Sequence, residues 1–151
     1  MRYIMEIQNE MRIMFLSKSE NESFCRVSTA AFLSQLDPVV SELVDIKTAV
    51  TEAVSNSIIH GYGNSYGVIT VNMRVYSDRT VEISVEDKGR GIADIERART
   101  PLYTTKQDEE RAGMGFTVME TFMDEVIIES TPGEGTTVTM KKLLNPAFHT
   151  T

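Results

Sequence analysis

The sequence predicts an α+β fold, a two-layer α/β sandwich with helices on one face of a mixed, mostly antiparallel sheet. Strand-like segments follow one another across short turns, which favours hairpins. Helix-like segments precede them without the regular alternation of strand and helix that a parallel sheet requires. With 151 residues, 41% of them hydrophobic and 25% charged, the chain fits a single domain over residues 1–151.

The first part of the chain is expected to hold a strand and a helix. Residues 11–17 are apolar enough for a strand, and the ten residues before them could be ordered, frayed or foreign to the natural start. Ser19 and Glu22 have the spacing of a capping box, which predicts a helix that ends at about Leu36. Its expected apolar face holds Phe24, Val27, Ala31 and Leu36, and its expected outer face holds Glu22, Ser23, Arg26 and Thr29.

A second, longer helix is predicted to begin at Asp37-Pro38, an N-cap followed by proline, and to end at Gly61. Residues 67–76 and 80–87 alternate apolar and polar side chains across a short turn, so we expect a hairpin. The remaining elements are a polar segment at 88–115, a short helix from about Phe116 to Phe122, and strands near 126–130 and 136–143.

Composition narrows the classes of function. The net charge of -7 argues against a broad nucleic-acid surface, because such a surface needs clustered Lys and Arg. No apolar run approaches the roughly 20 residues of a membrane helix, and the start lacks the features of a signal peptide. The lone Cys25 has apolar neighbours, which favours a buried thiol over a nucleophile. We therefore expect a cytoplasmic protein without a direct nucleic-acid or membrane partner.

A polar stripe runs along the second predicted helix. Glu52, Asn56 and His60 recur every four residues, so Glu52 and Asn56 share one face with their β-carbons about 6 Å apart. Without further signals, both would be read as solvated helix-surface residues. The Asn56 amide oxygen is a suitable ligand for Mg²⁺. His60 is better explained by capping or local packing than by metal binding.

Three glycine motifs follow this stripe, at 87–91, 113–116 and 133–137. Each alone is more simply a turn. At the predicted helix start, however, Gly113 and Gly115 would leave backbone amides free to hold phosphate oxygens. The chain contains neither a P-loop string nor a Gly-x-Gly-x-x-Gly turn after a first strand.

The stripe and the three motifs, over about residues 45–140, resemble the Bergerat-type ATP-binding fold of gyrase, the large heat-shock chaperone ATPase, histidine kinases and MutL. The strings at 52–62 (EAVSNSIIHGY), 101–106 (PLYTTK) and 111–116 (RAGMGF) carry a closer resemblance. They are similar to the small serine kinases that double as anti-sigma factors, of the anti-sigma F type found in spore-forming bacteria.

The resemblance implies roles for individual residues. Glu52 corresponds to the general base, and Asn56 to the residue that contacts Mg²⁺ and the triphosphate. A mobile lid is implied over about 94–112; Lys106 within it could equally be a solvated loop charge, because residues 108–110 are acidic. The other residues implied at the nucleotide are Thr104, Thr105, Lys106, Arg111, Gly113, Met114 and Gly115.

At the base, Asp87 corresponds to the aspartate that accepts a hydrogen bond from the adenine amino group and so selects ATP over GTP. Gly89 and Gly91 would let the base approach closely. Thr136 corresponds to a threonine that supports the aspartate, although alone it would be read as a routine strand residue.

The implied function is an ATP-dependent kinase, requiring Mg²⁺ and yielding ADP, that phosphorylates a serine of an anti-anti-sigma factor and inhibits a sporulation sigma factor of the sigma F type. Arg26 is implied on the surface that binds both partners, and a homodimer is implied as well. A general-stress-type anti-sigma kinase and a nucleotide-gated binding module without kinase activity remain alternatives. A histidine kinase is disfavoured because no separate helical region carries a phosphoacceptor histidine, and gyrase or MutL would need further domains.

Overall fold

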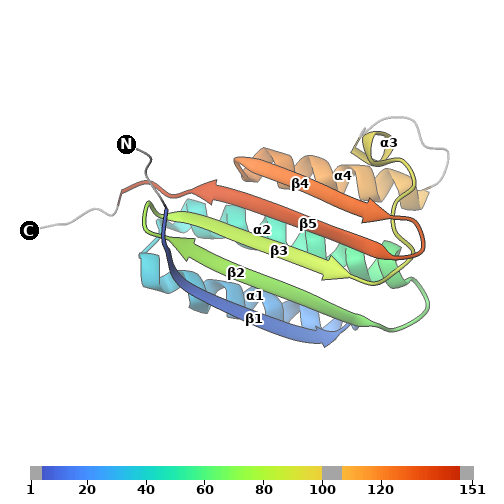
Figure 1. Ribbon diagram of the computed structural model, residues 1–151, viewed down its shortest axis with the longest axis horizontal. Helices are drawn as coiled ribbons and strands as arrows, with labels where there is room; N and C mark the ends of the chain where they lie inside the picture. The colour runs from blue at the N-terminus through green and yellow to red at the C-terminus, as the bar shows by residue number, and fades with distance from the viewer. Residues whose placement is uncertain (1–4, 100–106, 147–151) are drawn as a thin grey trace, which may run out of the picture.

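The computed structural model describes residues 5–99 and 107–146, with residues 107–114 described by their backbone alone. Five strands form one sheet in the order β1-β2-β3-β5-β4, and every neighbouring pair is antiparallel. The helices lie on one face of this sheet (Figure 1), so the predicted α+β sandwich is confirmed.

The strands are β1 (Ile7–Leu16), β2 (Val68–Tyr76), β3 (Thr80–Asp87), β4 (Glu125–Thr131) and β5 (Gly135–Leu143). The helices are α1 (Glu20–Leu33), α2 (Val40–Asn56), α3 (Ile95–Arg99) and α4 (Gln107–Phe122), with a 3-10 turn η1 (Ser34–Leu36) and a π-helical turn η2 (Ser57–Tyr62).

The hydrophobic core lies between the helices and the sheet face that they cover. The predicted hairpin is confirmed as β2 and β3, in which every second residue is buried and points to this face. The side chains that α2 buries recur at helical spacing and pack from the other layer. The strands contribute Ile69, Val71, Met73, Val75, Val81, Ile83 and Val85, and the helices contribute Ile46, Ala49, Val50, Ala53, Val54, Phe116 and Met119.

Helix α1 buries a different face from the predicted one. Cys25, Thr29 and Leu33 are buried, whereas Phe24 and Val27 are 64% and 67% exposed. The buried residues recur every four positions and so form one stripe. Thr29 was expected outside, but its Oγ1 donates a 2.8 Å hydrogen bond to the carbonyl oxygen of Cys25, which satisfies the buried hydroxyl. Ala31 is exposed as well. The predicted apolar face of this helix was therefore wrong, with the exception of Leu36, which is buried in η1.

The start of α1 also differs from the prediction. Ser19 has helical backbone angles and makes no side-chain cap. A capping side chain needs an extended backbone at that position. The predicted capping box is therefore not formed.

Helix α2 begins later than predicted and ends at Asn56, where the π-helical turn η2 takes over and runs to Tyr62. Asp37 adopts a left-handed φ of 48°, so the helix begins at Val40 instead of Pro38. The Val39 amide is capped by Glu42, whose Oε1 accepts its hydrogen bond at 3.1 Å. At the other end, η2 carries the chain through Gly61.

Helix α4 begins at Gln107, well before the predicted start at Phe116. Residues 107–112 are mostly strong helix formers, with acidic residues suited to a first turn. Gly113 and Gly115 therefore lie inside the helix and not at its start, so the predicted helix start at these glycines was wrong. Thr104, Thr105 and Lys106 lie outside the described residues.

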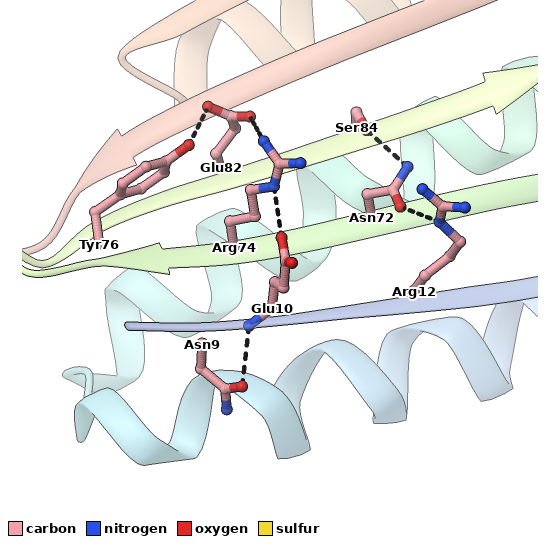
Figure 2. A network of polar contacts seen from close by, with 8 residues as sticks. All are labelled: Asn9, Glu10, Arg12, Asn72, Arg74, Tyr76, Glu82 and Ser84. Carbon is pink, nitrogen blue, oxygen red and sulfur yellow. Dashed lines mark hydrogen bonds and ion pairs between the residues drawn. The ribbon is translucent and has the colours of Figure 1, made fainter. Parts of the chain in front are cut away.

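The opposite face of the sheet is not covered by the described helices (Figure 1). A polar network crosses it (Figure 2): Arg74 Nε donates to Glu10 Oε2 at 3.0 Å, Arg74 Nη1 lies 3.9 Å from Glu82 Oε1, and Arg12 Nε donates to Asn72 Oδ1 at 2.7 Å. Exposed apolar side chains accompany it, namely Met14, Leu16, Val68 and Leu143. Among the described residues, no helix is long and apolar enough to cross a membrane.

Candidate functional site

Glu52 and Asn56 lie near the end of α2, where this helix packs against α4. Gly115 of α4 permits the close approach: a methyl carbon there would lie 2.9 Å from Asn56 Nδ2, 3.2 Å from Asn56 Oδ1 and 3.3 Å from Glu52 Oε2. The two polar side chains therefore converge on Gly115. Their spacing of four residues predicted that they share one face, and this is confirmed.

The Asn56 amide has an unsatisfied donor. Its Nδ2 is buried and has no hydrogen-bond partner among the described residues. A buried polar group without a partner costs about 1–3 kcal/mol, so it marks a place where a ligand atom would be stabilised. Nδ2 suits a phosphate oxygen, whereas Oδ1 is an oxygen ligand of the kind that Mg²⁺ prefers. In the described part of the chain, no group of three or more His, Cys, Asp or Glu could hold a metal ion. In many sites Mg²⁺ is held by one or two protein groups together with waters and substrate phosphates.

Asp87 ends β3 and is only 4% exposed. Ser57 Oγ donates to Asp87 Oδ2 at 2.8 Å, and the Gly89 amide donates to Asp87 Oδ1 at 2.9 Å. Gly61 lies against the carboxyl group, where a methyl carbon would be 3.0 Å from Asp87 Cγ. The carboxylate is thus held by one donor on each oxygen and retains free lone pairs for a further donor.

The glycines of this loop are required by packing. The Cβ position of Gly89 is filled by the Gly61 backbone, and that of Gly91, with φ of 73°, is filled by the Thr131 carbonyl. The Arg90 amide also donates to the Gly61 carbonyl oxygen at 2.9 Å. This packing explains both glycines within the protein itself, and their expected role toward a bound base stays a prediction.

Thr136 is paired with Asp87 across β3 and β5. Its Oγ1 lies 2.8 Å from Ser130 Oγ, and Ser130 Oγ also accepts the Ile92 amide at 2.7 Å. Ser130 thus links Thr136 to the loop that follows Asp87. The Thr136 hydroxyl contacts Ser130, and its predicted support of Asp87 stays a prediction.

The structure brings the predicted residues into two groups that a single turn joins. One group lies between α2 and α4, where Asn56 meets Gly115. The other lies at the end of β3 and the start of β5, where Ser57, the residue after Asn56, hydrogen-bonds to Asp87. Arg26 is exposed on α1, which lies toward the opposite edge of the sheet from α4 (Figure 1). Arg111, Gly113 and Met114 are described only as backbone of α4. The sequence analysis missed Ser57, Gly61 and Ser130; only the position of Ser57 beside Asn56 could have suggested a role.

Comparison with known proteins identifies relatives along nearly the whole chain. A family model described as a histidine kinase-like ATPase domain matches residues 17–142. The anti-sigma F factor of Thermoanaerobacter sp. (strain X514) is 59% identical over 140 residues, which cover 93% of this chain and 97% of that protein. The anti-sigma F factor of Clostridium novyi (strain NT) is 57% identical over 137 residues, covering 90% of this chain and 95% of that protein.

Solved structures share the fold. The RsbU and RsbW domains of a Mycobacterium tuberculosis protein match with a TM-score of 0.69 at 24% identity, covering 95% of this chain and 35% of that chain. The histidine kinase domain of a blue-light activated kinase from Erythrobacter litoralis EL346 matches with a TM-score of 0.52 at 23% identity, covering 70% of this chain and 46% of that chain. The site geometry, the family model and the identity over most of the chain agree: the chain belongs to the anti-sigma F factor family, whose fold is that of the histidine kinase-like ATPase domain.

Proposed function

We propose that this protein is an ATP-dependent serine kinase that phosphorylates an anti-anti-sigma factor and also binds and inhibits a sporulation sigma factor of the sigma F type. The observation that carries the proposal is the convergence of Glu52 and Asn56 on Gly115. The next residue, Ser57, hydrogen-bonds to the Asp87 carboxylate and so places that group beside them. A general base, an amide that can contact phosphate and an acceptor for the adenine amino group are parts that an ATP-dependent phosphoryl transfer can use.

Asp87 would select the nucleotide. Its carboxylate accepts hydrogen bonds only, so the adenine amino group can donate to it while the carbonyl oxygen of guanine would meet a second acceptor. Protein donors already orient both carboxylate oxygens, so binding of the base costs little further conformational entropy at this side chain.

Asn56 and Glu52 would act at the phosphates. Asn56 Nδ2 supplies the unpaired donor for a phosphate oxygen. Mg²⁺, when bound, neutralises charge on the β- and γ-phosphates. Glu52 then accepts the proton of the attacking serine hydroxyl, which makes that oxygen a better nucleophile. Lys106 and Arg111 are proposed to add positive charge at the γ-phosphate.

The partner surface is proposed to include Arg26. The relatives named above are called anti-sigma F factors, which supports binding of a sigma factor. Arg26 is exposed on α1, and the same helix exposes Phe24 and Val27 elsewhere on its surface. Arginine is one of the residue types enriched at binding hot spots.

A homodimer is proposed as well. The uncovered sheet face combines the polar network of Figure 2 with the exposed apolar side chains Met14, Leu16 and Val68. Contiguous exposed apolar area with a polar surround is typical of interfaces. Sedimentation equilibrium at micromolar concentration is expected to give twice the chain mass, and a monomer would refute this part of the proposal.

The kinase activity is tested by incubating the protein with γ-labelled ATP, Mg²⁺ and the anti-anti-sigma factor of a related spore former. We expect acid-stable phosphoserine on that partner. Glu52→Ala should lower the transfer rate by about a hundredfold or more while ATP binding is kept, because a general base is lost. Asp45→Ala removes another α2 carboxylate and is expected to transfer normally.

The alternatives give different results in the same assay. Acid-labile phosphate on the chain itself indicates a histidine kinase. Sigma-factor capture that depends on ATP, without any transfer, indicates a nucleotide-gated binding module. A preference for general-stress sigma and anti-anti-sigma proteins over the sporulation ones indicates a general-stress-type kinase.

A further inference from the structure

Ser57 forms a buried hydrogen bond for which neither the kinase mechanism nor the packing of the core accounts. It is 5% exposed, and its Oγ lies 2.8 Å from Asp87 Oδ2, across 30 residues of sequence. It is the first residue of the π-helical turn η2, directly after Asn56. Turns of this kind are frequent at functional sites.

The hydroxyl acts on the orientation of the Asp87 carboxylate. The Gly89 amide holds Oδ1 from the loop after β3, and Ser57 holds Oδ2 from the helical layer. Two donors from different elements fix the plane of the carboxylate, and with only one of them the group could turn about its bond to Cβ. Alanine at position 57 would favour the helix more than serine does, so the hydroxyl is not explained by helix propensity.

We propose that Ser57 is a specificity-determining positioning residue, which fixes the Asp87 carboxylate so that it recognises the amino group at position 6 of the purine. The inference rests on the proposed nucleotide site at Asp87. Ser57 acts through Asp87, so its effect on affinity is expected only for a ligand that offers a donor to that carboxylate.

The test compares two triphosphates that differ only at position 6: ATP, and purine riboside triphosphate, which carries hydrogen there. Affinities of wild type and Ser57→Ala for both are measured by calorimetry. We expect Ser57→Ala to weaken ATP binding by about twofold to tenfold, the range of one hydrogen bond, and to leave the analogue within about twofold. Ser55→Ala, the same change two residues earlier in α2, should leave both affinities unaltered.

A merely structural role for Ser57 predicts equal losses for the two nucleotides, and equal losses overturn the inference, as does an unchanged ATP affinity. If Ser57→Ala does not fold, Ser57→Cys keeps the size with a weaker donor and is expected to give the same selective loss. Asp87→Asn separates the two proposals. If it leaves ATP affinity unchanged, the proposed base contact fails; if it weakens ATP while Ser57→Ala acts equally on both nucleotides, only the role of Ser57 fails.

Discussion

Replacing Gly115 by alanine separates the catalytic geometry from the stability of the fold. The new methyl carbon would lie 2.9 Å from Asn56 Nδ2. Comfortable contact between such atoms begins at about 3.5 Å, so the Asn56 amide must move by about 0.6 Å. The amide is the end of a flexible side chain, and alanine inside a helix gains about 1 kcal/mol over glycine. We therefore expect the free energy of unfolding to stay within about 1 kcal/mol of wild type.

Phosphoryl transfer responds differently to the same change. A shift of about 1 Å in a positioning group can lower a rate about a hundredfold, so a shift of half that size is expected to lower transfer about tenfold or more. Urea unfolding and single-turnover transfer of labelled phosphate measure the two effects. Thr121→Ala, at an exposed position of the same helix, is the control and should change neither by much. Normal transfer by a stable Gly115→Ala variant would refute the placement of Asn56 at the phosphates.

Three further changes test other parts of the structure. Arg26→Ala should weaken binding of both protein partners by about 1–3 kcal/mol with ATP affinity unchanged, and a titration in which either partner binds as before contradicts the shared surface. Burial raises the pKa of Cys25 from 9.0 to about 11, against a smaller lowering effect of Thr29, so its contribution to the unfolding free energy is complete below pH 9. That contribution should fall by about 2–3 kcal/mol as pH rises from 9 toward 11. Urea unfolding of wild type and Cys25→Ala measures it as the difference between their unfolding free energies, and a difference that does not change with pH contradicts the prediction. Glu42 accepts hydrogen bonds from the Val39 amide at 3.1 Å and the Asn145 amide at 2.8 Å. Glu42→Ala should therefore lower the free energy of unfolding by about 2–4 kcal/mol and Glu42→Gln by about half as much. Equal losses in urea unfolding would show that the carboxylate acceptors are not responsible.

Features set by local pattern could be predicted from the sequence. The alternation in β2 and β3 gave their bounds within a residue, because one face of the sheet is buried along its whole length. Glu52 and Asn56 were expected on one face because a helix places residues four apart side by side. Both predictions needed only neighbours in the chain.

Features set by contacts between distant segments could not be predicted in this way. On α1, Phe24 is apolar but exposed and Thr29 is polar but buried, since Thr29 meets its hydrogen-bonding need within its own helix. At the site, Ser57 reaches Asp87 and Gly61 packs on Gly89, and neither pair is marked by a local motif. Periodicity gives the faces of a helix, but tertiary packing decides which face is buried.

The base contact of Asp87 is the central claim, and calorimetry of MgATP binding to Asp87→Asn tests it most directly. The substitution keeps the size of the side chain and exchanges a carboxylate oxygen for an amide nitrogen, which lacks an acceptor for the adenine amino group. A hydrogen bond to a charged group is worth about 1.5–3 kcal/mol, so the dissociation constant is expected to rise roughly tenfold to a hundredfold while the variant stays folded. A folded Asp87→Asn protein that binds MgATP as tightly as wild type would contradict the claim and remove Asp87 from the adenine site.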